Sequence, residues 1–159
     1  MFNLSNYKSS KLYKKNFIKF IIWEIINLVY FKTSLPGNFF RIILLRSLGA
    51  KIGNNVVIKP NVKIKYPWNL NIGDNSWIGE NVWIDNISNV KIGNNTCISQ
   101  GVYICSASHN YKDKNFELLL QPVEVGDNCW VAAKCIIGPN TIIPSGTFIK
   151  MGEKITSKF

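Results

Sequence analysis

One aliphatic residue returns at every sixth position over most of the region from residue 51 to residue 156. A period of six fits neither an α-helix nor a strand of alternating polarity, but it fits a chain that turns a corner every six residues. Three such faces close a triangular coil of about eighteen residues, and stacked coils bury the aliphatic residues as columns. The pattern therefore predicts a β-solenoid. The repeat positions are Ile52, Ile58, Ile64, Ile72, Ile78, Ile84, Ile92, Ile98, Ile104, Val125, Val131, Ile137, Ile143, Ile149 and Ile155.

Asparagine and glycine mark the predicted corners. Asparagine tolerates left-handed backbone better than any other residue except glycine. Glycines directly after the aliphatic positions, such as Gly53 and Gly73, relieve crowding at the same bends. The asparagines that stand three positions after an aliphatic residue are Asn55, Asn61, Asn75, Asn81, Asn95, Asn128 and Asn140.

Three irregularities interrupt the six-residue count, and repeat proteins usually carry their function at such insertions. The spacing is eight from Ile64 to Ile72 and again from Ile84 to Ile92, so two corners are enlarged. Between the repeat positions 104 and 125 the spacing is twenty-one. The fifteen extra residues predict an excursion loop over residues 105–124. It contains His109, the single histidine of the chain.

The first 50 residues have a different pattern. Apolar residues in the segment 17–31 follow a helical stripe, and residues 39–48 predict a second short helix that caps the first coil. About fifteen residues cannot span a bilayer of ~30 Å, and no small-residue cleavage site follows. The first helix is therefore expected to pack on the solenoid or on a neighbouring subunit, with an interfacial membrane helix as the alternative. We divide the chain into a helical segment, 1–50, and a β-helix domain, 51–159.

The corner sequences Ile-Gly-Asn-Asn, Ile-Gly-Asp-Asn and Val-Gly-Asp-Asn-Cys-Trp resemble those of the hexapeptide-repeat acyltransferases. Over about residues 12–156 the chain is similar, more narrowly, to sugar O-acetyltransferases of the colanic-acid-biosynthesis type, and it also resembles maltose and galactoside acetyltransferases. The resemblance implies an all-β fold, a left-handed parallel β-helix with short N-terminal helices. The handedness rests on the resemblance alone, because parallel crossovers are ordinarily right-handed. The segments that carry the narrower similarity are 59–70, 83–86 and 97–101.

The resemblance gives His109 the position of the family's general base. A sugar hydroxyl is a poor nucleophile until a base removes its proton during attack on a thioester, and an imidazole titrates in the required range. The imidazole needs a partner that fixes which nitrogen is unprotonated. Asp85 is the predicted partner, with a purely turn-shaping role as the alternative. Asn81, Asn86 and Glu117 are predicted to contact the acceptor.

The resemblance also implies a groove for the pantetheine arm of acetyl-CoA, the expected acetyl donor. Small outward side chains line such a groove, since only they let a long flexible arm lie against the coil. The end of the groove receives the nucleotide and its phosphates. No metal is expected to take part. The residues predicted to bind the donor are Trp130, Ala132, Ala133, Lys134, Met151 and Thr156.

The charge and the cysteines of the chain indicate which ligands it favours and in which compartment it works. The net charge of +10 favours anionic ligands such as coenzyme phosphates, nucleotide sugars or acidic lipids. Nucleic acid is disfavoured, because the chain has no recognition-helix or RNA-binding motif. Cys97, Cys105, Cys129 and Cys135 lack CxxC spacing and are predicted to be reduced packing residues of a cytoplasmic protein, with a disulfide as the alternative. The resemblance implies a homotrimer with active sites between neighbouring prisms.

Together these features predict an acetyl-CoA-dependent O-acetyltransferase. Its acceptor is expected to be a sugar hydroxyl of a surface-polysaccharide or related saccharide precursor. The protein is expected in the cytoplasm, either free or bound peripherally at the inner face of the membrane. An amino-sugar N-acetyltransferase and a non-catalytic scaffold are the alternatives, although a scaffold predicts an uninterrupted repeat. A γ-type carbonic anhydrase is excluded because it needs three histidine ligands. A serine acetyltransferase is disfavoured because its large helical N-terminal domain is missing.

Overall fold

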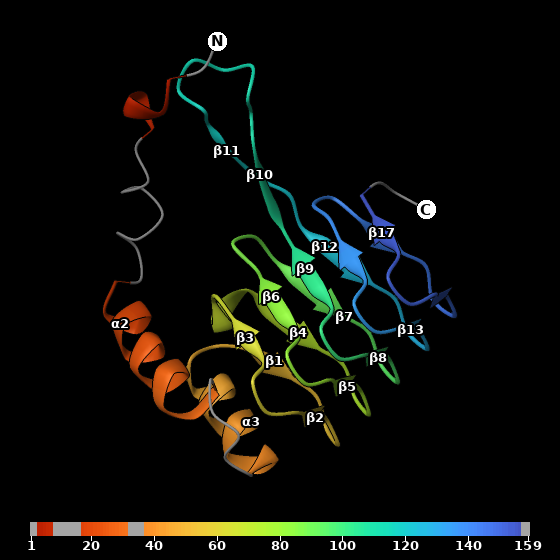
Figure 1. Ribbon diagram of the computed structural model, residues 1–159. Helices are drawn as coiled ribbons and strands as arrows, with labels where there is room; N and C mark the ends of the chain where they lie inside the picture. The colour runs from red at the N-terminus through yellow and green to blue at the C-terminus, as the bar shows by residue number, and fades with distance from the viewer. Residues whose placement is uncertain (1–2, 8–16, 32–36, 157–159) are drawn as a thin grey trace.

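The computed structural model describes residues 3–7, 17–31 and 37–156, and its main body is a stack of five triangular coils (Figure 1). Each coil contributes one short strand to each of three parallel sheets, ordered β1-β4-β7-β12-β15, β2-β5-β8-β13-β16 and β3-β6-β9-β14-β17. We call these sheets A, B and C. The strands are, coil by coil, β1 (Lys51–Ile52), β2 (Val57–Ile58), β3 (Lys63–Ile64); β4 (Leu70–Ile72), β5 (Trp77–Ile78), β6 (Trp83–Asp85); β7 (Val90–Ile92), β8 (Cys97–Ile98), β9 (Tyr103–Cys105); β12 (Val123–Val125), β13 (Trp130–Val131), β14 (Ile136–Ile137); β15 (Ile142–Ile143), β16 (Phe148–Ile149) and β17 (Lys154–Ile155).

The predicted repeat positions form the core. The register stacks each one on its equivalent in the next coil, as for Ile52, Ile72 and Ile92 in sheet A. Every position from Ile52 to Ile149 in the series is at most 7% exposed, and Ile155 in the last coil is partly buried. Burying such a side chain stabilises the fold by about 1.5–3 kcal/mol, so the repeat itself supplies the main driving force for folding.

The corners follow the asparagine prediction. All seven predicted asparagines have left-handed backbone, with φ between 51° and 59°. Four of their side-chain amides also link coils: Asn55 Nδ2 donates to Asn75 Oδ1 at 3.1 Å, and Asn95 Nδ2 donates to Asn128 Oδ1 at 2.7 Å. A Cβ at Gly73 would lie 2.7 Å from the backbone of the next coil, so only glycine fits there.

The cysteines are free thiols. Cys129 and Cys135 are buried against the core, and Cys97 and Cys105 are half-buried. This arrangement confirms the predicted packing role of Cys129 and Cys135.

The N-terminal helices pack on the first coils, as predicted. They are α2 (Phe17–Ile26), the π-helical turn η2 (Asn27–Phe31) and α3 (Asn38–Ser47). The short helix η1 (Leu4–Asn6) lies apart from them, beside the excursion over residues 105–124. Trp23 is fully buried, and its Nε1 donates to the carbonyl of Ile64 at 2.9 Å. Asn38 caps the first coil, because its side chain donates to Val56 O and accepts from Ile58 N. None of the described helices is long and apolar enough to cross a bilayer.

The predicted excursion takes the form of a β-hairpin. β10 (Ala107–His109) and β11 (Leu118–Leu120) pair antiparallel, with His109 opposite Leu118. The hairpin leaves the stack after β9 and returns into β12, so it projects from the edge where sheets C and A meet (Figure 1). Figure 1 also places the N-terminal segment beside its tip.

Candidate active site

His109 lies on the hairpin with its imidazole held by Phe116. The ring stacks on the Phe116 ring with centroids 4.3 Å apart and planes 8° apart. Its Nδ1 lies 2.8 Å from the Phe116 carbonyl oxygen. Phe116 has a left-handed φ of 52°, a conformation that bulky residues rarely adopt and that functional sites often retain. The strained residue therefore supplies both contacts that orient the imidazole.

The carbonyl partner decides the tautomer of His109. A carbonyl oxygen can only accept a hydrogen bond, so the Nδ1 that meets it carries the proton when the imidazole is neutral. Nε2 is then the unprotonated nitrogen. The geometry thus leaves an unprotonated ring nitrogen on a half-buried side chain.

Tyr7 forms a second aromatic contact to the imidazole. Its ring meets His109 edge-on, with centroids 5.1 Å apart and planes 76° apart, and it lies 6.4 Å from the Phe116 ring. Sequence reasoning missed both Tyr7 and Phe116. Tyr7 was missed because no repeat spacing relates residue 7 to residue 109. Phe116 was missed because it acts through its backbone carbonyl, which every residue type has.

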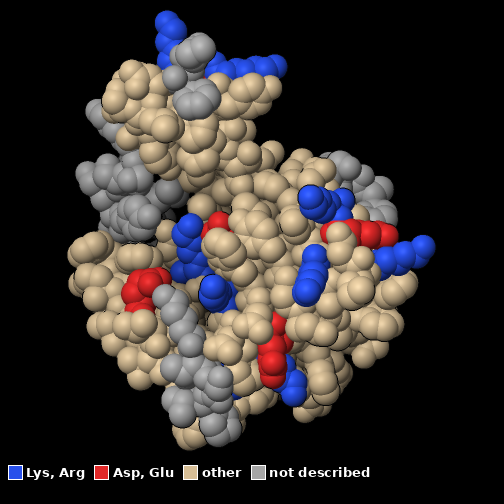
Figure 2. Space-filling model, in the orientation of Figure 1, with Lys and Arg blue, Asp and Glu red and all other residues tan. Residues whose placement is uncertain are grey.

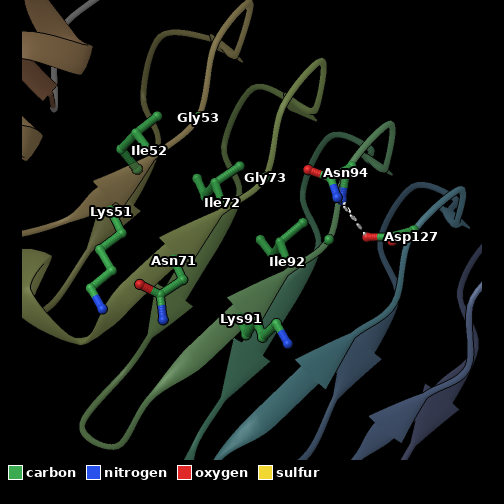
Figure 3. Close-up of a pocket in the computed structure, with 11 residues that line it drawn as sticks. Lys51, Ile52, Gly53, Asn71, Ile72, Gly73, Lys91, Ile92, Asn94 and Asp127 are labelled. Atoms are coloured by element: carbon green, nitrogen blue, oxygen red, sulfur yellow. Dashed lines mark hydrogen bonds between the residues drawn. The ribbon is translucent and has the colours of Figure 1, made fainter.

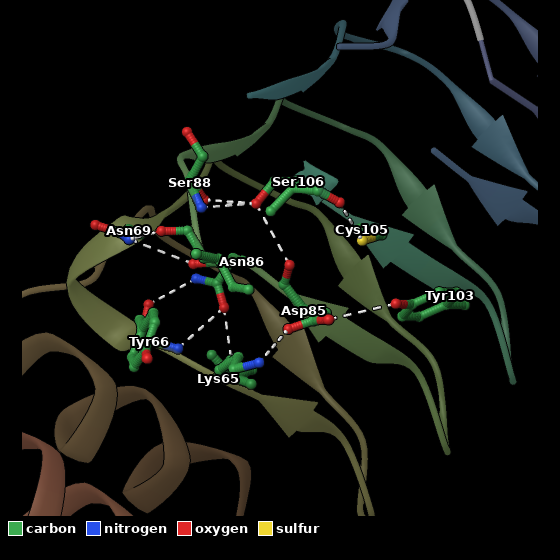
Figure 4. Close-up of polar contacts among 12 residues, drawn as sticks. Lys65, Tyr66, Asn69, Asp85, Asn86, Ser88, Tyr103, Cys105 and Ser106 are labelled. Atoms are coloured by element: carbon green, nitrogen blue, oxygen red, sulfur yellow. Dashed lines mark hydrogen bonds and ion pairs between the residues drawn. The ribbon is translucent and has the colours of Figure 1, made fainter. Parts of the chain in front are cut away.

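Asp85 belongs to a different polar cluster, on the outer face of sheet C (Figure 4). Its carboxylate lies 3.1 Å from Lys65 Nζ and accepts a hydrogen bond of 3.3 Å from the Tyr103 hydroxyl. Burial raises the pKa of the Tyr103 hydroxyl, and the nearby Cys105 thiol and Asp85 carboxylate raise it further, so this hydroxyl stays a donor. Among the described contacts of Asp85, none is to His109. Within one chain it is the Phe116 carbonyl that contacts His109 Nδ1, and the orienting role of Asp85 stays a prediction.

Asn86 holds the enlarged corner together. It is fully buried, its Nδ2 donates to Tyr66 O at 2.6 Å, and its Oδ1 accepts from the backbone N–H groups of Lys65 and Tyr66. Both the NH₂ group and the oxygen of the Asn86 amide are thus hydrogen-bonded within the chain, and the amide has no access to solvent. In the described chain Asn86 therefore holds the corner, and its contact with the acceptor stays a prediction.

The other two predicted acceptor residues lie apart. Asn81 is exposed at the corner between β5 and β6, where sheets B and C meet, with a φ of 58°. Glu117 is exposed on the hairpin itself, and its backbone carbonyl accepts from Asn110 N at 2.8 Å. Of the predicted acceptor residues, only Glu117 shares an element with His109.

One buried hydroxyl, that of Ser106, holds the root of the hairpin on the coil below. Ser106 is fully buried; its Oγ donates to Ser88 O and accepts from Ser88 N, both at 2.9 Å (Figure 4). The same hydroxyl contacts the carbonyl of Asp85 at 3.3 Å. The arm that carries His109 therefore starts from a fixed point.

The predicted donor residues gather on coils four and five. Trp130 is 53% exposed on the outer face of sheet B, tilted against Phe148 at 4.9 Å, and its Nε1 donates to Ser99 Oγ at 3.0 Å. Ala133 O accepts from Gly152 N at 3.0 Å, which brings the 132–134 corner beside the exposed Met151.

Two of these donor residues deviate from the simple pattern. Lys134 takes the corner position that asparagine holds elsewhere, with a φ of 60°. Thr156 follows β17 in sheet C and lies beside Gly138, so it sits one corner further along than the other predicted donor residues.

His109 and Trp130 lie on different sides of the prism. His109 projects from the edge between sheets C and A, whereas Trp130 faces outward from sheet B. The described chain does not bring the two halves of the predicted site together.

Two other features of the described chain lie outside this constellation. A shallow hollow of about 550 Å³ runs along sheet A, with Lys51, Asn71 and Lys91 side by side in it (Figure 3), and it contains none of the predicted site residues. Among the described residues, no group of three or more His, Cys, Asp or Glu could hold a metal ion.

Comparison with known proteins identifies the family. No protein-family model matches the chain. The chain is 36% identical over 135 residues to the colanic acid biosynthesis acetyltransferase WcaF of Escherichia coli (strain K12), and the match covers 84% of this chain and 74% of that protein. The chain belongs to this acetyltransferase family.

Solved structures support the same assignment of the fold. A hexapeptide-repeat acetyltransferase of Vibrio cholerae O1 biovar eltor, complexed with acetyl coenzyme A, has a TM-score of 0.80 at 18% identity, over 94% of this chain and 81% of that chain. A maltose O-acetyltransferase of Clostridium difficile 630 has a TM-score of 0.68 at 22% identity, over 91% and 80%. The fold is therefore the predicted left-handed parallel β-helix of hexapeptide repeats.

Proposed function

We propose that this protein transfers an acetyl group from acetyl-CoA to a sugar hydroxyl of a surface-polysaccharide precursor or related saccharide, with His109 as the general base. The observation that carries the proposal is the 2.8 Å contact between His109 Nδ1 and the Phe116 carbonyl, because it leaves Nε2 free to accept a proton. The saccharide class is supported by relatives named for colanic acid biosynthesis and for maltose.

The reaction needs one proton acceptor that later becomes a donor. His109 Nε2 takes the hydroxyl proton as the sugar oxygen attacks the thioester carbonyl. The tetrahedral intermediate then expels the thiolate, and the imidazolium returns the proton to sulfur. The products are an acetyl ester and free coenzyme A, and His109 is regenerated.

The donor is proposed to lie along coils four and five. Ala132 and Ala133 leave room for the pantetheine arm beside the exposed ring of Trp130, and Lys134 offers a cation at the adjoining corner. Met151 and Thr156 continue this surface onto the last coil. The neighbouring Vibrio structure, which holds acetyl coenzyme A, supports the choice of donor.

The active site is proposed to lie between chains of a homotrimer. His109 and Trp130 occupy different sides of one prism, so a neighbouring chain has to supply the missing half. Cyclic three-fold symmetry would create three equivalent sites, each with the hairpin of one chain and the groove of the next.

The charge distribution fits small anionic ligands. Figure 2 shows the Lys and Arg side chains scattered over this face, several of them beside acidic side chains. Nucleic acid binding typically uses one continuous basic patch, and this face has none among its described residues.

A peripheral contact with an anionic membrane is also proposed, through the exposed side of α2 and η2. Seven large apolar side chains there are 43–74% exposed, and Lys19 lies among them. Apolar side chains beside basic residues are the pattern of helices that lie in a membrane interface.

The decisive test is a thiol-release assay with acetyl-CoA across free sugars, nucleotide sugars, lipid-linked oligosaccharides and amino sugars. The wild-type protein should release thiol with a hydroxyl acceptor, and His109→Ala should lower turnover by about 10²–10⁴-fold. The melting temperature and coenzyme binding should change little, because His109 lies outside the core and the groove. Transfer to amino sugars alone would replace O- by N-acetylation. No thiol release together with no coenzyme binding would leave the scaffold hypothesis.

A further inference from the structure

Residues 3–7 lie against the hairpin that carries His109, although about a hundred positions separate them in sequence. Asn3 N donates to the Lys114 carbonyl at 3.1 Å, and the Asn3 side chain caps η1 by accepting from Ser5 N at 3.0 Å. The short helix then delivers Tyr7 to the imidazole. The N-terminal segment is thus built onto the arm that bears the proposed base.

The hairpin needs such support. β10 and β11 are three residues each and project from the coils, and an isolated two-stranded hairpin is marginally stable in water. Its root is fixed by Ser106, but that hydroxyl lies three residues before His109. A side chain on an unsupported arm can sample several rotamers, and the observed one places Nδ1 against the Phe116 carbonyl.

Tyr7 contacts the imidazole in a way that restricts it. Phe116 stacks on the ring at 8°, and Tyr7 meets it edge-on at 76°. An edge-to-face contact is a favoured aromatic arrangement, and it is specific in direction because the positive ring edge meets a π face. With Phe116 stacked on it, Tyr7 edge-on and Nδ1 hydrogen-bonded, the imidazole is restrained by three separate contacts.

We propose that Tyr7 is a positioning residue of the acetyl-transfer site. Its ring, and not its hydroxyl, holds His109 in the rotamer that bonds Nδ1 to Phe116 and leaves Nε2 for the acceptor. Residues 3–7 therefore form part of the active site. The inference rests on the proposed function only for the role of His109 as base; the contact itself is independent of it.

The first experiment observes the imidazole directly. His109 is the single histidine, so ¹⁵N-labelled full-length protein gives one set of imidazole signals. Tyr7→Ala should shift the ring-proton resonances and move the nitrogen shifts toward a mixture of tautomers, whereas Tyr7→Phe should leave them close to wild type. Tyr111→Ala is the matched control, because Tyr111 lies on the same hairpin, is 64% exposed and has its described ring contact with Lys112. Unchanged His109 signals in Tyr7→Ala would overturn the proposal.

The second experiment measures turnover. Tyr7→Ala should lower kcat by up to about 10²-fold, since misplacement of a catalytic group by about 1 Å has an effect of this size. The KM for acetyl-CoA should stay unchanged, because the donor groove lies on coils four and five. Tyr7→Phe should restore kcat to within about twofold of wild type, and Tyr111→Ala should retain it.

The outcomes separate the two proposals. An equal loss in Tyr7→Phe and Tyr7→Ala would assign the effect to the hydroxyl and overturn positioning by the ring. Unchanged kcat in Tyr7→Ala would also overturn it. If His109→Ala retains full turnover while Tyr7→Ala still shifts the imidazole signals, the proposed base is wrong but the Tyr7 contact stands.

Discussion

His109 is oriented by a backbone carbonyl, where many imidazole bases use a carboxylate. Both partners accept a hydrogen bond from Nδ1 and so fix the same tautomer. A carbonyl brings no charge, and its position depends on the backbone at Phe116 alone. The left-handed conformation of Phe116 is therefore part of the proposed site.

This geometry makes a prediction for the resting protein. In the neutral form, ¹⁵N spectra should show His109 protonated at Nδ1. Asp85→Asn should keep that tautomer, because the described contacts of Asp85 are to Lys65 and Tyr103. An Nε2-protonated imidazole in the wild type would contradict the assignment of Nε2 as base. Loss of the tautomer in Asp85→Asn would restore the orienting role that the sequence suggested, acting from a neighbouring chain.

Residue type alone could predict some of these positions and not others. The seven corner asparagines were predictable because a left-handed residue leaves a signature in the sequence. The place of His109 on the excursion was predictable because the repeat count is interrupted there, and its role as base stays a prediction. Phe116 and Tyr7 were not, since one acts through its carbonyl and the other through a contact between distant segments. The complete burial of Asn86 was not predicted either, because the burial of a corner amide cannot be read from its residue type.

At the scale of elements, the strands were predictable and the excursion only in part. Every coil needs one buried aliphatic residue on each face, so the six-residue spacing of these residues is enough to predict the strands of the β-helix. The hairpin has no such constraint. Leu119 and Leu120 are neighbours and both are exposed on β11, so this strand lacks the alternation of buried and exposed residues by which a strand is predicted from sequence. The position of the hairpin in the chain follows from the interruption of the six-residue repeat, but the pairing of its two strands does not.

α2 and η2 together have a buried side and an exposed apolar side. Trp23, Asn27 and Phe31 recur every four residues and are buried on the β-helix. The opposite side exposes Phe17, Ile18, Ile21, Ile22, Ile25, Leu28 and Val29. Exposed apolar surface of this kind marks an interaction site. The net charge of +10 favours anionic lipid as the occupant, with Lys19 on this helix and four more lysines among residues 8–15.

The double variant Ile18→Glu/Ile25→Glu tests this face. The wild-type chain should float with vesicles that contain anionic phosphatidylglycerol and bind neutral vesicles more weakly, and the variant should bind at least about tenfold more weakly. Ile142→Glu is the control, because Ile142 is a 45% exposed isoleucine on sheet A, and it should bind as the wild type does. Absence of vesicle binding by the wild type would contradict membrane contact. Dissociation of oligomers in the double variant would instead assign the face to a neighbouring subunit.

At the scale of the whole molecule, the two halves of the proposed site face different ways. The hairpin leaves the edge between sheets C and A, and the donor residues lie toward sheet B. The repeat count could assign the predicted residues of each half to a coil or to the excursion, but their roles in the site stay predictions, and the contact between Tyr7 and His109 was missed. The assembly of the two halves into one site is proposed to depend on the outer surface of a neighbouring chain, and a repeat of buried residues does not specify that surface.

A complementation experiment tests whether the site lies between chains. His109→Ala removes the base, and Ala133→Trp fills the proposed groove, so each variant alone should be inactive. Co-expressed in one cell, the two chains should form mixed trimers in which about a quarter of the interfaces pair an intact hairpin with an intact groove, and activity should return to that level. Light scattering should give three times the chain mass of 18.1 kDa. A site contained in one chain would give no recovery, because every chain carries one defect, and a fully active monomer would exclude the trimer outright.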